Sequence, residues 1–143
     1  MATFSIQTLK KLVYDKLKSD ATLIALLGGT ANIFHFHPQQ ASDIPYPIVV
    51  YSILGIEDNV YNADITGSIN SLIINIDIFS SDSSTEEADK IADRIFVLLN
   101  GKNLSNDSVI VYSCYRDFQD ENYEADGQVW RINARYNLTN AVK

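Results

Sequence analysis

The chain reads IPYPIVVYSIL from Ile44 to Leu54, GIEDNVYNADITGSIN from Gly55 to Asn70, SLIINIDIF from Ser71 to Phe79 and STEEADKIADRIFVLLNG from Ser84 to Gly101. The first segment is apolar almost throughout, which predicts a strand buried on both faces. The second is polar and acidic, and it predicts a long loop. The third alternates apolar and polar residues, as a half-buried strand does. The fourth predicts an amphipathic helix that opens with a capping box and ends at its glycine.

The apolar residues of the alternating strand and of the helix are spaced so that each element has one face to bury. In the strand, every second residue from Leu72 to Ile78 is apolar, so a slip of one residue would expose the whole set. In the helix, the apolar stripe consists of Ala88, Ile91, Ala92, Ile95, Phe96, Leu98 and Leu99. The two faces are therefore expected to pack against each other.

The flanking sequence adds further elements on both sides of this unit. Before it, we expect a helix over residues 5–19, a short helical piece ending at Gly28–Gly29 and a short strand from Ile33 to His37. After it, we expect strands from Val109 to about Phe118 and from about Gln128 to Leu138, joined by a second acidic loop. The order α-β-β-β-α-β-β predicts a single α+β domain over residues 1–143. It would have one mostly antiparallel sheet of about five strands, with the two main helices on one face.

The composition is that of a globular domain with an unusual distribution of charge. Hydrophobic residues make up 46% of the chain and charged residues 20%, with a formal net charge of −7. Residues 1–42 carry a net charge of +2, residues 43–126 of −12 and residues 127–143 of +3. The acidic middle disfavours recognition of a nucleic-acid backbone. The single cysteine, Cys114, lies in an apolar run and is expected to be a buried, inert thiol.

Candidate catalytic chemistry is sparse in this sequence. His35 and His37 share one face of a strand and could hold a metal ion, but only Asp43 offers a third ligand nearby. A nucleotide-binding glycine pattern and a nucleophile-elbow pattern are both missing from the sequence. Asp77, inside the alternating strand, is explained by a solvent-facing sheet or a subunit contact. We therefore expect no catalytic residues, no cofactor and no metal, and keep a small metal-dependent hydrolase as a remote alternative.

Several segments, in this order, resemble the tail-completion, or tail-terminator, family of long-tailed bacteriophages. They are Leu23 to Gly29, IPYPIVVY (Ile44 to Tyr51), the strand from Ile73 to Phe79, the helix with Ala88, Ile91 and Ala92, the segment Leu98 to Gly101 and the closing QVWRINARYNL. The resemblance implies an α+β fold that closes into a ring, typically a hexamer. Such a ring caps the head-proximal end of the tail tube, ends tube polymerisation and offers the surface that joins the head.

The same resemblance implies the partners: further copies of the chain, the tail tube protein and a head-completion or connector protein. DNA would pass through the lumen without sequence-specific binding, and no membrane is involved. The protein would be assembled in the bacterial cytoplasm and found in the virion. The alternative is another neck, connector or baseplate component of a phage or of a prophage-derived particle.

Two acidic segments are the candidate contact sites under this interpretation. The first is expected to reach a neighbouring subunit or the tube, through Glu57, Asp58, Tyr61 and Asp64. The second is expected to face the lumen or a subunit interface, through Asp120, Glu121, Tyr123, Glu124 and Asp126. Tyrosine supports either role, because it offers a large amphipathic contact area.

Overall fold

The structure is a computed structural model that describes residues 6–36, 44–59, 69–102, 104 and 109–142. The side chains of residues 6, 55–59, 69–70, 109–112 and 140–142 lie outside that description. The elements are α1 (Ile6–Lys18), α2 (Ala21–Leu26), β1 (Ile33–His35), β2 (Ile48–Asn59), β3 (Ile69–Ser80), α3 (Glu86–Leu99), β4 (Val109–Glu124) and β5 (Val129–Val142). None of the helices within these ranges is long and apolar enough to cross a membrane.

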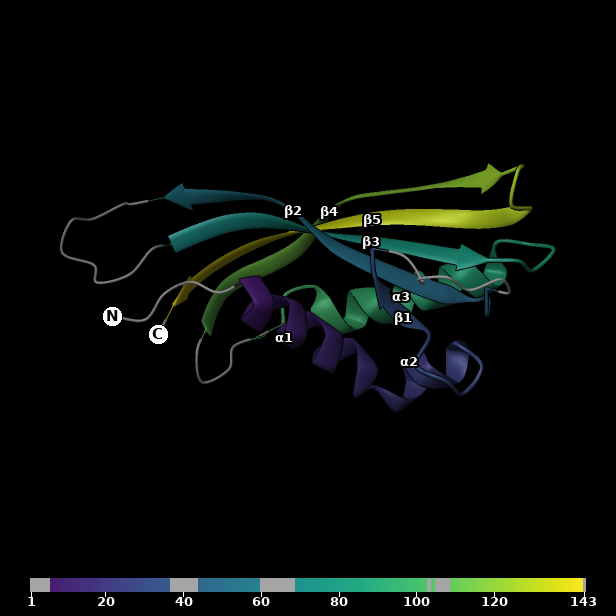
Figure 1. The fold of residues 1–143 in the computed structure, drawn as a ribbon, viewed down its shortest axis with the longest axis horizontal. Coiled ribbons are helices and arrows are strands. Elements are labelled where there is room, and N and C mark those ends of the chain that lie inside the picture. The colour runs from purple at the N-terminus through teal and green to yellow at the C-terminus, as the bar shows by residue number, and fades with distance from the viewer. Residues whose placement is uncertain (1–5, 37–43, 60–68, 103, 105–108, 143) are drawn as a thin grey trace.

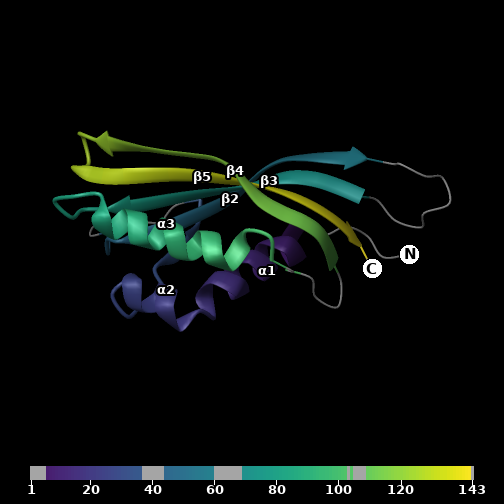
Figure 2. The same cartoon turned by 180° about the vertical axis from the view of Figure 1, so that it is seen from behind.

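The five strands form one sheet in the order β1-β2-β3-β5-β4. β1 pairs with β2 in parallel, and every other pairing is antiparallel. The three helices lie together on one face of the sheet and leave the other face open (Figures 1 and 2). The predicted α+β class, with helices on one face of a mostly antiparallel sheet, is confirmed.

The core forms where β3 meets the helices. Ile74, Ile76 and Ile78 are fully buried on the helix-facing side of β3, as their alternation predicts. From α3, six of the seven stripe residues are buried, and Phe96 packs partly against the cluster. Burying an aliphatic side chain of this size contributes about 1.5–3 kcal/mol. Cys114 joins the same cluster, so its expected burial is confirmed, and burial raises the pKa of its thiol to about 12.

The predicted capping box at the start of α3 is wrong. Thr85 occupies the N-cap without a side-chain hydrogen bond, and the helix begins at Glu86. The carboxylate of Glu87 instead accepts a hydrogen bond from the hydroxyl of Ser80, with 2.7 Å between the oxygens. Ser80 is fully buried at the end of β3, and a buried hydroxyl without a hydrogen-bond acceptor is unfavourable. The Glu87 carboxylate is that acceptor and therefore does not cap the helix. The predicted helix end is confirmed, since Gly101 adopts φ 68° and its N–H donates to the carbonyl of Cys114.

A partly buried ion pair joins α2 to α3. No pattern in the sequence indicated it. Asp20 caps α2 by accepting the N–H of Leu23, with an Oδ2–N distance of 2.8 Å. Its carboxylate also receives two hydrogen bonds from Arg94, at 2.7 and 2.8 Å. The Arg94 guanidinium lowers the pKa of Asp20, against the opposing effect of burial. Bidentate pairing of this kind fixes the orientation of both helices.

The two acidic stretches are strands over most of their described length, which corrects their prediction as loops. β2 continues to Asn59 and β3 starts at Ile69, with Asp58 paired to Asn70 across the ladder. β4 continues to Glu124, and only a short turn separates it from β5. Ladder hydrogen bonds join backbone groups, so a strand can continue beside its neighbour without an apolar face of its own. β1, in contrast, is shorter than predicted. It ends at His35, because Phe36 adopts φ 70°.

Candidate interaction surfaces

The two acidic segments lie at opposite ends of the sheet. Along β3, Ile69 pairs with Ala141 at one end and Ser80 pairs with Trp130 at the other. The end of β2 lies at the first of these ends and the β4–β5 turn at the second (Figure 1). A strand of 12 residues spans about 40 Å. The two segments are therefore separate surfaces and not parts of one site.

The structure places only part of the first predicted contact set. Glu57 and Asp58 lie on β2, opposite Ser71 and Asn70 of β3, so their backbone is held in the hairpin ladder. Tyr61 and Asp64 lie outside the described residues. In the described part, β3 is paired at this end with β2 on one side and with β5 on the other, so Glu57 and Asp58 lie within the sheet.

All residues of the second predicted set are described. Asp120, Glu121, Tyr123 and Glu124 lie on β4, which is an edge strand of the sheet, and Asp126 lies in the following turn. Residues 117–123 and 125–128 are all exposed. Glu121 comes near Asp89 of α3, and partial desolvation together with the Asp89 charge raises the pKa of Glu121. The end of β4 therefore presents an acidic, unpaired edge.

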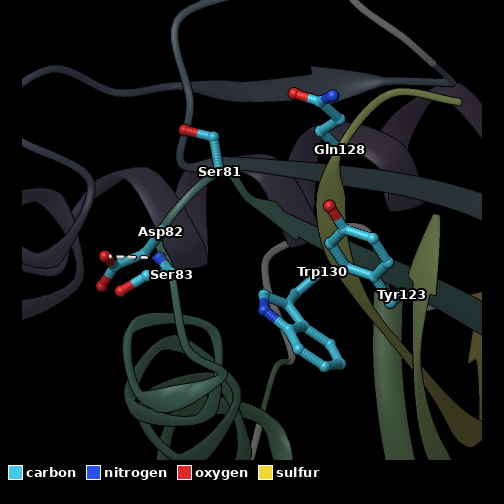
Figure 3. Close-up of a pocket in the computed structure, with 6 residues that line it drawn as sticks. All are labelled: Ser81, Asp82, Ser83, Tyr123, Gln128 and Trp130. Atoms are coloured by element: carbon cyan, nitrogen blue, oxygen red, sulfur yellow. Dashed lines mark hydrogen bonds between the residues drawn. The ribbon is translucent and has the colours of Figure 1, made fainter. Parts of the chain in front are cut away.

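A shallow hollow of about 490 Å³ adjoins this edge (Figure 3). Its lining consists of Ser81, Asp82, Ser83, Tyr123, Gln128 and Trp130. The Tyr123 and Trp130 rings meet edge to face, with centroids 5.1 Å apart. The carboxylate of Asp82 is engaged by the N–H of Ser83 at 2.8 Å. Hydroxyls, an amide, a carboxylate and two aromatic rings are typical of a surface that contacts another protein.

The open face of the sheet carries a polar network centred on Asp77. Its Oδ1 accepts a hydrogen bond from Nδ2 of Asn133 at 2.8 Å and forms an ion pair with Arg131 at 3.0 Å. Asn75 closes the network, donating to Asp77 Oδ2 at 3.0 Å and accepting from Asn133 at 2.8 Å. Arg131 also reaches Glu124 of β4 at 3.4 Å. The carboxylate that looked out of place in the sequence therefore links three adjacent strands.

One signal in the sequence could have indicated this network. Asn75 and Asp77 occupy alternate positions of β3, and Arg131 and Asn133 do the same on β5. Both pairs lie in the polar phase of their strands, which places them on the same face if the strands are neighbours. The sequence does not show that β3 and β5 are neighbours in the sheet, because α3 and β4 separate them along the chain.

The pair of histidines that suggested a metal site is only half described. His35 Nε2 is buried and has no hydrogen-bond partner in the described residues, and its ring lies against Phe36 and Tyr51. His37 and Asp43 lie outside those residues. Within residues 6–36, 44–59, 69–102, 104 and 109–142, no three His, Cys, Asp or Glu side chains gather closely enough to hold a metal ion.

His35 is expected to make the protein less stable in mild acid. Burial, reinforced by the charge of Lys10, lowers the pKa of His35 from its usual 6.5. Above pH 6.5 the imidazole is neutral in both the folded and the unfolded state, and it contributes no pH dependence. As the pH falls below 6.5 the unfolded state takes up the proton first, so stability decreases.

Replacing His35 with phenylalanine should remove that loss, so the gain in melting temperature over the wild type is larger at pH 5 than at pH 7.5. Thermal unfolding followed by circular dichroism at both values measures it. His37→Phe is the matched control. An unchanged pH slope in His35→Phe would contradict the expectation.

Comparison with known proteins identifies what this arrangement resembles. The model of the family described as "Tail completion protein gp17" matches residues 11–139. No curated protein matches the chain. Among solved structures, a chain from the "Virion of native gene transfer agent (GTA) particle" is similar in fold, with a TM-score of 0.72 and 17% sequence identity. The alignment covers 99% of this chain and 100% of that one.

Proposed function

The chain belongs to the tail completion protein gp17 family, and from this premise we propose that it forms the ring that ends a phage tail tube. It is a structural protein of a phage-type tail. The ring would cap the head-proximal end of the tube, stop tube polymerisation and offer the surface on which the head-completion or connector protein docks. The observation that carries this proposal is the family match, which extends over residues 11–139 and so includes four strands of the sheet completely and most of β5.

The geometry of the sheet supports a part that joins two different neighbours. Its two ends carry different surfaces about 40 Å apart: the β2–β3 hairpin at one, the β4–β5 turn with its hollow at the other. A ring subunit needs separate contact surfaces for the tube and for its neighbours in the ring. We assign the tube, or an adjacent subunit, to the hairpin residues Glu57, Asp58, Tyr61 and Asp64.

The net charge suits a ring through which DNA passes. The chain carries −7 overall, so its surface repels a phosphate backbone. DNA would slide through the lumen without sequence-specific binding, and the virion tail is the place where the protein acts. The proposal includes no reaction, because members of this family are structural virion proteins.

Length control of tube assembly tests the proposal. The full chain is added to polymerising tail tube protein, and tube lengths are measured by negative-stain electron microscopy. We expect rings in the free protein and tubes that shorten as its concentration rises. A protein that stays monomeric and leaves tube length unchanged would overturn the proposal. Immunogold labelling of whole particles separates a head-proximal cap from a baseplate or other neck component.

A paired variant tests the assignment of the hairpin to the tube. Glu57→Lys with Asp58→Lys should weaken tube capping about 10-fold or more, since reversing interface charges places like charges together. The matched control is Asp93→Lys, which reverses an exposed carboxylate on the outer side of α3. Equal capping by both variants would remove the hairpin from the contact.

A further inference from the structure

We propose that copies of this chain join side by side, with the acidic edge of one against the basic edge of the next. The acidic edge is residues 117–126 on β4 and its turn; the basic edge is the exposed face of α1. This inference rests on the proposed ring and adds to it the two surfaces that meet. It also chooses between the two roles left open for the β4 segment, an interface or a lumen lining.

The two edges lie on opposite sides of the molecule. The sheet order places β1 and β4 at its two margins. α1 covers the β1 side, where the Tyr14 ring lies 6.3 Å from that of Tyr51 on β2. α3 covers the β4 side, where the Arg116 guanidinium lies 4.3 Å from the ring centre of Phe96. When the acidic edge of one copy contacts the basic edge of another, the pair therefore still has one free acidic edge and one free basic edge.

The acidic edge is prepared for a partner in charge and in shape. Residues 117–126 contain five carboxylates and neither lysine nor arginine: Asp117, Asp120, Glu121, Glu124 and Asp126. Within the described part of the chain, no lysine or arginine forms an ion pair with Asp120 or Asp126. The same strand exposes Tyr115, Phe118 and Tyr123, at 52%, 42% and 51%. Aromatic rings flanked by free charges are typical of a contact surface.

The basic edge has the complementary composition. α1 carries Lys10, Lys11, Lys16 and Lys18 against one acid, Asp15. Lys11 and Lys18 are exposed and seven residues apart, so they lie on one face of the helix. Lys11 pairs only with Asp15 on the same helix, and Lys18 lies over the Tyr14 ring, 5.5 Å from its centre. Such exposed pairs are weak, so both cations can be shared with a neighbour.

Charge also decides how the edges can combine. Pairing of β4 with β4, the usual hazard of an unpaired edge strand, would bring five carboxylates against five and is strongly disfavoured. Contact of β4 with α1 of the next copy brings opposite charges together. Because the two surfaces differ, the contact is heterologous, and repetition of it produces a closed ring or an open filament and not a two-fold dimer.

A charge-swap experiment on the full chain tests this pairing. Asp117→Lys, Asp120→Lys and Asp126→Lys together change the charge of residues 117–126 from −5 to +1, and Lys11→Glu with Lys18→Glu, in a separate variant, changes that of α1 from +3 to −1. Each variant should weaken self-association about 100-fold or more, because like charges then meet. Native mass spectrometry measures assembly, and circular dichroism confirms folding. The control, Glu86→Lys with Asp93→Lys, reverses two exposed carboxylates of α3 that belong to neither edge. Wild-type rings should also loosen as salt rises from 0.05 to 0.5 M, roughly as the Debye length shortens.

The decisive arm mixes the two reversed variants in equal amounts. One then has two basic edges and the other two acidic edges, so they should restore rings in which the variants alternate. Rings formed by the β4 variant alone, as efficiently as by the wild type, would overturn the pairing and place the acidic edge elsewhere, at the lumen for example. Failure of the mixture to assemble would also overturn it. A wild type that stays monomeric even with tube protein would instead refute the ring itself.

Discussion

Replacing Ile76 with alanine is expected to lower the free energy of unfolding by about 3–4 kcal/mol. Ile76 is fully buried in the middle of β3, paired with Tyr51 of β2 on one side and Ala134 of β5 on the other. Both neighbours are hydrogen-bonded into the ladder, so the strands cannot close around the lost side chain. The cavity therefore remains and adds its cost to the lost burial. Urea denaturation followed by circular dichroism measures the difference.

Ile73→Ala is the matched control for this variant. Ile73 lies on the same strand but on the open face, where it is partly exposed. Both substitutions remove a β-branched side chain from β3, so the change in strand propensity is shared. The control should cost about 1 kcal/mol, since little cavity forms at an exposed site. Equal losses at the two positions would mean that the helices do not cover this face as tightly as the burial of Ile76 indicates.

Replacing Asp77 with alanine is expected to cost about 2–3 kcal/mol, the second largest effect. Its side chain is only 15% exposed, and it accepts hydrogen bonds from Arg131, Asn133 and Asn75. Removing it leaves the Asn75 and Asn133 amides, each 8% exposed, without their carboxylate partner. The Arg131 guanidinium is 35% exposed and can turn to water, which keeps the loss below that of a fully buried pair.

A double-mutant cycle of Asp77→Ala with Arg131→Ala isolates the ion pair from the amide contacts. We expect a coupling energy of about 1 kcal/mol, because solvent screens the partly exposed arginine. Asp120→Ala is the control: it removes a carboxylate from the same sheet at an exposed site and should change stability by less than about 0.5 kcal/mol. A loss at Asp77 no greater than at Asp120 would show that the network does not contribute to stability.

The network also bears on assembly. It joins β3 to β5 and, through Glu124, to β4, so it stiffens the strand that carries the acidic edge. Loosening it should therefore weaken self-association as well as stability, whereas Ile73→Ala should leave association unchanged. Weaker association in Asp77→Ala but not in Ile73→Ala would support the proposed contact at the β4 edge, with the open face of the sheet holding that edge in place.

The sequence by itself determined the element types, the buried faces and the fold class. Those follow from periodicity, which is local: the alternation from Leu72 to Ile78 and the stripe of α3 each specify one apolar face, and two such faces pack in few ways. Polarity was less informative at the strand ends. The acidic stretches were predicted as loops because they lack an apolar face, but they form strands that backbone hydrogen bonds hold to their neighbours in the sheet.

Only the tertiary structure decided which residues meet. The strand order β1-β2-β3-β5-β4 brings Asp77 beside Asn133 and Arg131, more than 50 residues away, and leaves β4 at the margin of the sheet. It also sets the lysines of α1 on the side opposite to β4, and Asp20 against Arg94. The spacing of residues along the chain does not predict such contacts. They depend on which strands become neighbours when distant segments bury their apolar faces together.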